Sequence, residues 1–164
     1  MSPKVKLSVY ERSILAICSE IEDAVALLYR YFSGLYADND NISKLFITIA
    51  LEEEDHSNQF KFANRLCGTG MKSVNTDSQQ IETILKRIKS VYEAVQKSPP
   101  ILKDALDLLI NIETLLSEYH MNTIVVFENE KLSRLFNSMR NNDDIHVQML
   151  KQVMWPGFVR QPAG

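Results

Sequence analysis

The chain has 164 residues, 45% of them hydrophobic, with a formal net charge of −3 and an isoelectric point near 5.6. This length can bury a substantial core, and we expect a single domain. The mild negative charge and the scattered lysines argue against a nucleic-acid partner. No apolar run reaches the roughly 18 to 20 residues that span a bilayer, and the N-terminal residues lack the apolar segment of a signal peptide. We therefore expect a cytoplasmic protein that does not enter a membrane.

The two cysteines exclude several kinds of site. Cys18 and Cys67 are far apart in the sequence and form no C-x-x-C motif. A disulfide framework, a zinc ribbon and a rubredoxin-like iron site are therefore excluded, and we expect both cysteines to be small core residues.

Glycine and proline, five each, mark the breaks between long segments that show no strand-like alternation. This pattern predicts an all-α fold. The predicted helices cover residues 8–37, 43–67, 78–97, 101–127 and 131–155. Short loops join the first two and the last two helices into antiparallel hairpins, and a long crossover carrying the 78–97 helix connects the hairpins. This connectivity is typical of a ferritin-like four-helix bundle, and it excludes an up-down-up-down bundle with a short second connection.

The segment EEEDH, which begins at Glu52, concentrates acids and a histidine within the second predicted helix. At about 100° per residue, Glu53 lies at the centre of the apolar stripe, and His56 lies on the same stripe. Glu52, Glu54 and Asp55 fall beside or opposite the stripe, so we expect them to be flanking or solvated. An uncompensated buried carboxylate costs several kcal/mol. Glu53 therefore needs a partner.

Each of the other three long helices also carries one acid at the centre of its apolar stripe. These acids are Glu22, Glu113 and Asp143, and His146 follows Asp143 as His56 follows Glu53. Glu20, Glu118 and Asp144 lie off the stripes. Glu22 precedes Glu53 by 31 residues and Glu113 precedes Asp143 by 30, so the two hairpins look like degenerate copies with acids at matching heights.

Four buried carboxylates repel one another and take up protons unless cations compensate them. Two divalent metal ions would neutralise four carboxylates, and such ions accept oxygen and imidazole ligands together. The sequence therefore predicts a dinuclear metal site with six ligands: Glu22, Glu53, His56, Glu113, Asp143 and His146. An open alternative is that the interior acids pair with arginine or lysine, for which Arg12 and Arg140 lie at the stripe edges.

The pattern resembles the ferritin-like superfamily and, within it, the rubrerythrin group. EDAVALLYRYF, residues 22–32, is similar to the first-helix pattern in which Tyr-x-Tyr-Phe begins seven residues after a ligand glutamate. EEDH carries the second-helix Glu-x-x-His, and DDIH takes the place of the fourth-helix motif. The resemblance covers about residues 8–155. It implies a non-haem di-iron centre, with manganese as an alternative metal, ligated by the six residues above and oxidised by peroxide or oxygen.

The chain departs from the rubrerythrin pattern in three ways. Its residues carry no rubredoxin-like cysteine motif, so we expect electrons to come from a separate donor such as a rubredoxin-like protein. Asp143 replaces a glutamate, and because its side chain is shorter we expect its half of the centre to be the weaker one. Leu116 stands where rubrerythrins carry an additional carboxylate. Tyr29 and His120, each seven residues after an acid, are either partners of the ligand carboxylates or ordinary core residues.

Several functions remain open from the sequence. A di-iron oxidoreductase would reduce peroxide or oxygen. An iron-storage protein would use ferroxidation to sequester iron, and a metal-free structural or regulatory bundle would use neither. A di-iron hydroxylase would need a substrate channel that no motif indicates. We expect a homo-oligomer, with a dimer as the simplest case.

Overall fold

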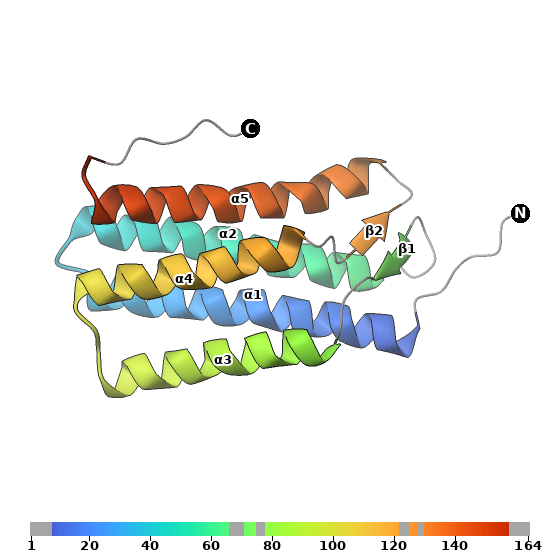
Figure 1. The fold of residues 1–164 in the computed structure, drawn as a ribbon, viewed down its shortest axis with the longest axis horizontal. Helices are drawn as coiled ribbons and strands as arrows, with labels where there is room; N and C mark the ends of the chain where they lie inside the picture. The colour runs from blue at the N-terminus through green and yellow to red at the C-terminus, as the bar shows by residue number, and fades with distance from the viewer. Residues whose placement is uncertain (1–7, 66–70, 75–77, 122–124, 128–129, 158–164) are drawn as a thin grey trace, which may run out of the picture.

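The computed structural model describes residues 8–65, 71–74, 78–121, 125–127 and 130–157. These residues form five helices and a two-stranded antiparallel ribbon (Figure 1). The helices are α1 (Val9–Leu35), α2 (Asp40–Arg65), α3 (Ser78–Lys97), α4 (Leu102–Met121) and α5 (Glu130–Met154). The strands are β1 (Met71–Val74) and β2 (Val125–Phe127). The expectation of a helical bundle is confirmed, and α3 has the predicted bounds.

Capping residues explain where the first two helices begin. Ser8 and Glu11 form a capping box, in which Ser8 Oγ accepts from the Glu11 amide at 3.1 Å and Glu11 Oε2 accepts from the Ser8 amide at 2.7 Å. Helix α2 begins three residues earlier than predicted, at Asp40. Asn39 Oδ1 accepts from the Ile42 amide at 3.2 Å, so the asparagine satisfies a backbone donor of the first turn.

The predicted helix over residues 101–127 is too long, because α4 ends at Met121 and residues 125–127 form β2. Strand β2 pairs with β1, with Val74 opposite Val125 and Met71 opposite Phe127. Its β-branched and aromatic residues favour an extended backbone, whereas apolar periodicity alone cannot distinguish a short strand from a helix segment.

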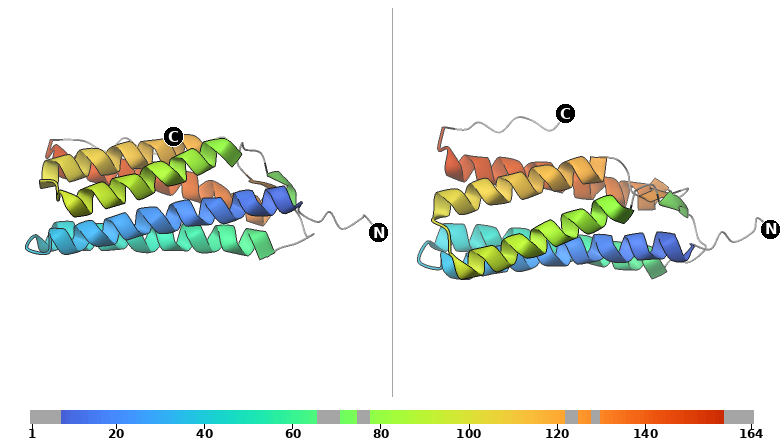
Figure 2. Two further views of the ribbon diagram at one scale, coloured as in Figure 1. Left: turned by 90° about the horizontal axis from the view of Figure 1, so that it is seen from below. Right: turned by 60° about the horizontal axis from the view of Figure 1, so that its bottom comes forward.

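The helices lie side by side with their long axes nearly parallel (Figures 1 and 2). Helices α1 and α2 form one antiparallel pair, α4 and α5 form another, and α2 contacts α5 between the pairs. Helix α3, which joins the pairs in the sequence, packs along α1. The ribbon lies at the end of the bundle where α1 begins.

The Tyr-Arg-Tyr-Phe segment of α1 explains much of this packing. The Tyr29 hydroxyl group donates a hydrogen bond to Glu113 on α4. Arg30 forms an ion pair with Glu54 on α2. The Tyr31 hydroxyl group donates a hydrogen bond to the carbonyl of Val95 on α3. The Phe32 ring is fully buried in the core. Four consecutive residues therefore hold α1 against its neighbours.

No helix among the described residues is both long enough and apolar enough to cross a membrane.

Candidate metal centre

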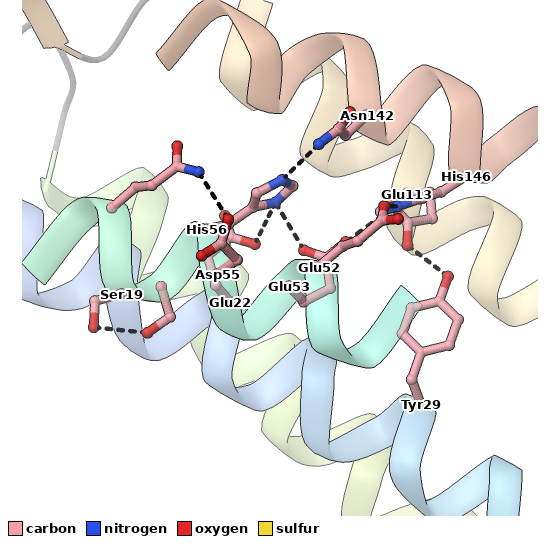
Figure 3. A network of polar contacts seen from close by, with 12 residues as sticks. Ser19, Glu22, Tyr29, Glu52, Glu53, Asp55, His56, Glu113, Asn142 and His146 are labelled. Atoms are coloured by element: carbon pink, nitrogen blue, oxygen red, sulfur yellow. Dashed lines mark hydrogen bonds and ion pairs between the residues drawn. The ribbon is translucent and has the colours of Figure 1, made fainter. Parts of the chain in front are cut away.

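The six residues predicted as ligands lie together in the interior of the bundle. Helix α1 contributes Glu22, α2 contributes Glu53 and His56, α4 contributes Glu113, and α5 contributes Asp143 and His146. Every one of these side chains is at most 1% exposed. Helices α1, α2, α4 and α5 each direct at least one of these side chains into the interior, where the six residues form one cluster (Figure 3 shows most of them).

The cluster divides into two groups that could each hold a metal ion. One consists of Glu53, Glu113, Asp143 and His146, and the other of Glu22, Glu53 and His56. Within each group, one donor atom per residue lies within 4.8 Å of all the others. Glu53 belongs to both groups, so its carboxylate can bridge two ions.

The two oxygen atoms of Glu53 face different histidines. Oε1 lies 2.9 Å from Nδ1 of His146, and Oε2 lies 3.2 Å from Nδ1 of His56. His56 Nδ1 is also 3.9 Å from Glu22 Oε2, and His146 Nδ1 is 3.4 Å from Glu113 Oε2. Both imidazole rings therefore present Nδ1 to the carboxylates, and their centroids lie 6.4 Å apart.

Several of these atoms fit a cation better than a hydrogen bond. Glu53 Oε1, Glu113 Oε2 and His146 Nδ1 are buried, and within the described part of the chain none has a hydrogen-bond partner of suitable geometry. Glu53 and Glu113 also contact no lysine or arginine side chain that the structure describes. Buried oxygen and nitrogen atoms that converge in this way, without hydrogen bonds of suitable geometry among them, are atoms that a metal ion could satisfy. The donor set, carboxylates and imidazoles, fits a divalent transition metal.

The pKa values show how strongly the cluster attracts positive charge. Burial lowers the pKa of His56, but the carboxylates of Glu22 and Glu53 outweigh burial and raise this pKa to about 11. Burial also opposes protonation of His146, and here Glu113, Glu52 and Glu53 raise the pKa well above its ordinary value. The pKa of Glu113 is raised by burial and by the charge of Glu53. In the metal-free chain, protons on the histidines thus take the place of metal charge.

Tyr29 contacts a cluster carboxylate, which is one of the two roles that the sequence left open for it. Its hydroxyl group donates a 2.5 Å hydrogen bond to Glu113 Oε1. The Tyr29 ring packs against Phe46, with ring centroids 5.9 Å apart, and this contact keeps the hydroxyl group aimed at α4. His120 belongs to α4, but its side chain lies outside the described residues, as do Cys67 and the side chain of Arg140.

Two functional candidates, Glu52 and Asn142, were not identified from the sequence. Glu52 was expected to be flanking or solvated, and its side chain is indeed 45% exposed, but its Oε2 lies 2.6 Å from Nε2 of His146. Asn142 Nδ2 lies 3.4 Å from Nε2 of His56. Each of these residues immediately precedes an inward acid, Glu53 or Asp143. That shared position marks them in the sequence, but their contacts with the histidines depend on how α2 and α5 pack together.

The acids predicted to face outward do so. Glu20 and Glu118 are exposed, Glu20 near Lys89 at 3.5 Å. Asp144 is exposed and accepts a 2.6 Å hydrogen bond from Ser117, whereas its neighbour Asp143 is fully buried. Arg12 is also exposed. Cys18 is buried, as expected, and its Sγ contacts the Tyr119 hydroxyl group at 2.5 Å.

Comparisons with protein-family models, with curated proteins and with solved structures found no significant match to this chain.

Proposed function

We propose that this chain is a ferritin-like, rubrerythrin-like protein with a dinuclear metal centre, occupied by two iron ions or, alternatively, by manganese. In this proposal it is an oxidoreductase that reduces peroxide or oxygen with electrons from a separate donor, such as a rubredoxin-like protein. The observation that carries the proposal is the position of Glu53, whose two oxygens face His146 and His56 separately and which belongs to both candidate groups. A carboxylate shared in this way is typical of two adjacent metal ions.

Different residues of the chain would hold each of the two ions. Glu113, Asp143 and His146 would hold one ion, Glu22 and His56 would hold the other, and Glu53 would bridge them. When bound, iron would supply the one-electron redox couple that the chain's side chains lack. The surrounding apolar side chains exclude bulk water, and Tyr29 holds the Glu113 carboxylate in place through its hydrogen bond.

An iron-storage protein with ferroxidase activity is the alternative supported by a specific observation. Leu116 is fully buried where rubrerythrins carry an additional carboxylate, so the chain lacks that carboxylate at this position. A storage protein does not need it. The oligomeric mass separates the two functions, because storage in a protein shell requires a large closed assembly, whereas the oxidoreductase is proposed to be a dimer.

The decisive experiment is anaerobic loading with Fe(II) followed by titration with peroxide. We expect about two irons per chain, oxidation by peroxide that is visible in the absorbance spectrum, and re-reduction by an added rubredoxin-like donor. Replacement of both Glu53 and His56 by alanine removes the shared carboxylate and one imidazole, so this variant should no longer bind two irons per chain. A chain that binds no iron would instead be a metal-free structural bundle, and a double variant that still binds two irons would show that the chain binds iron elsewhere.

The matched control for this experiment is Glu54→Ala. Glu54 follows Glu53 directly in α2, but it points outward and pairs with Arg30 at 2.6 Å. This variant should still bind two irons. Equal loss of iron from the control and from the Glu53 and His56 variant would show that the charge of α2, rather than the cluster, attracts the metal.

A further inference from the structure

The two candidate metal groups differ in the number of protein donors. Glu53 is common to both groups. Beyond it, and among the described residues, the first group has Glu113, Asp143 and His146, whereas the second has Glu22 and His56. Because each additional anionic or imidazole donor strengthens the binding of a divalent ion, the two positions are not equivalent.

The two histidines also differ in the residue that contacts Nε2, the ring nitrogen that faces away from the cluster. His146 Nε2 lies 2.6 Å from a carboxylate oxygen of Glu52. His56 Nε2 lies 3.4 Å from the side-chain amide of Asn142, a longer contact with a neutral group. The supports cross between helices, since Glu52 of α2 faces the histidine of α5 and Asn142 of α5 faces the histidine of α2 (Figure 3).

These outer contacts affect metal binding through the proton on Nε2. Both rings present Nδ1 to the cluster, so a histidine that binds metal through Nδ1 keeps its proton on Nε2 and donates it outward. A carboxylate such as Glu52 accepts this hydrogen bond strongly, orients the ring and makes Nδ1 a better ligand. An amide can accept the same bond only through Oδ1, which requires Asn142 to turn its side chain, and the bond is then weaker.

We infer that the two metal positions differ in affinity and that the position at Glu113, Asp143 and His146 fills first. Glu52 and Asn142 are the positioning residues that increase this difference in affinity. The inference rests on the proposed function, because it concerns the same centre. It reverses the expectation that the shorter Asp143 makes its half the weaker one: Asp143 is fully buried and belongs to the group with more donors. The Glu22 and His56 position, with fewer protein donors, is the one from which an ion exchanges more readily.

The test is a stepwise titration of the metal-free chain with Co(II), followed by its visible absorbance, and with Zn(II), followed by calorimetry. The unsubstituted chain should show two steps of different affinity. His56→Ala should lose the weaker step, and His146→Ala should lose the tighter one. These two variants assign each step to a position.

Two substitutions of nearly unchanged shape then test the outer residues. Glu52→Gln should weaken the tighter step about 10- to 100-fold, the range found for partners of metal-bound histidines, and should leave the other step unchanged. Asn142→Asp should strengthen the weaker step and bring the two affinities closer. Glu54→Gln is the matched control, because Glu54 lies on the same helix but pairs with Arg30 at the surface, and it should change neither step.

Failure of this inference differs from failure of the proposed function. A chain that binds neither Co(II) nor Zn(II) would overturn both. Two equal steps in the unsubstituted chain, or a weaker step assigned to His146, would overturn the inference alone. Circular dichroism shows whether Glu52→Gln folds. If it does not, Asn142→Asp provides the test, and an unchanged affinity of the weaker step in that variant would overturn the role of Glu52 and Asn142.

Discussion

The Tyr29 hydroxyl group on α1 lies 2.5 Å from Glu113 Oε1 on α4, 84 residues further along the chain. Both residues are fully buried. The contact links the first hairpin to the second at the cluster, so it contributes both to the fold and to the position of a candidate ligand.

Replacement of Tyr29 by phenylalanine tests this double role. The variant leaves a buried carboxylate without its donor, so we expect the free energy of unfolding of the metal-free chain to fall by about 1–3 kcal/mol. Metal affinity should fall as well, because Glu113 is no longer held in place. Urea unfolding and Zn(II) calorimetry measure the two effects. Tyr31→Phe is the matched control, since Tyr31 donates to the carbonyl of Val95 away from the cluster and should leave metal binding unchanged.

Inward and outward acids should differ sharply in their effect on metal binding. Glu22→Ala and Glu113→Ala each remove a fully buried candidate ligand, so tight binding of two ions should be lost. Glu20→Ala and Glu118→Ala alter exposed residues, and metal stoichiometry should stay at about two per chain. Metal analysis after gel filtration provides the measurement. Equal losses from both pairs would contradict the placement of the site inside the bundle.

Asp143 and Asp144 provide the same comparison between adjacent residues. Asp143→Ala should lose the ion held with His146, whereas Asp143→Glu keeps a carboxylate and should retain both ions with altered oxidation kinetics. Asp144→Ala removes a part-buried hydrogen bond from Ser117, outside the candidate ligand set, and should do little to metal binding. Metal stoichiometry and stopped-flow absorbance distinguish these outcomes. Loss of metal from Asp144→Ala alone would contradict the assignment of Asp143.

Metal binding should release protons and strengthen as the pH rises. The carboxylates of Glu22 and Glu53 outweigh burial and raise the pKa of His56 to about 11, so at pH 7 the metal-free chain holds a proton there that a metal ion must displace. Each proton released makes the affinity rise about tenfold per pH unit. Calorimetry in buffers of different ionisation enthalpy counts the protons, and His56→Ala should release about one fewer. A metal affinity independent of pH between 6 and 8 would contradict this account.

The same pKa shift predicts how the stability of the metal-free chain depends on pH. A histidine whose pKa is raised in the folded state stabilises the fold fully below its unfolded pKa of about 6.5. For His56 this contribution is lost as the pH rises toward about 11. Urea unfolding of the metal-free chain at several pH values should therefore show a smaller decline above pH 7 for His56→Ala than for the unsubstituted chain.

Helical phase was sufficient to identify the buried acids and both cluster histidines from the sequence. Glu53 and Asp143 stand at the centres of apolar stripes, and burial follows directly from that position. The roles of Glu52 and Asn142 could not be found in this way. Each contacts a histidine on the other helix, and such a contact depends on how far α2 and α5 are rotated and shifted relative to one another, which the pattern within one helix does not contain.

The end of α4 was mispredicted for a related reason. Val125 and Val126 fit the apolar pattern of a helix, but they pair with Val74 and Ser73 of β1, which lie far earlier in the sequence. A strand of three residues is stabilised by its partner rather than by its own pattern. Where local preference is weak, the pairing between distant segments decides the structure.

The burial of four acids in one cluster also links the supply of metal to the lifetime of the chain. Without cations these acids oppose folding, so apolar replacements would give a more stable bundle without the candidate metal ligands. Under the proposed function, an ion present at a hundred times its dissociation constant would add about 2.7 kcal/mol to the free energy of unfolding. In a cell that degrades unfolded chains, a change of this size alters abundance severalfold. The amount of protein would then follow the amount of available metal without any dedicated regulator.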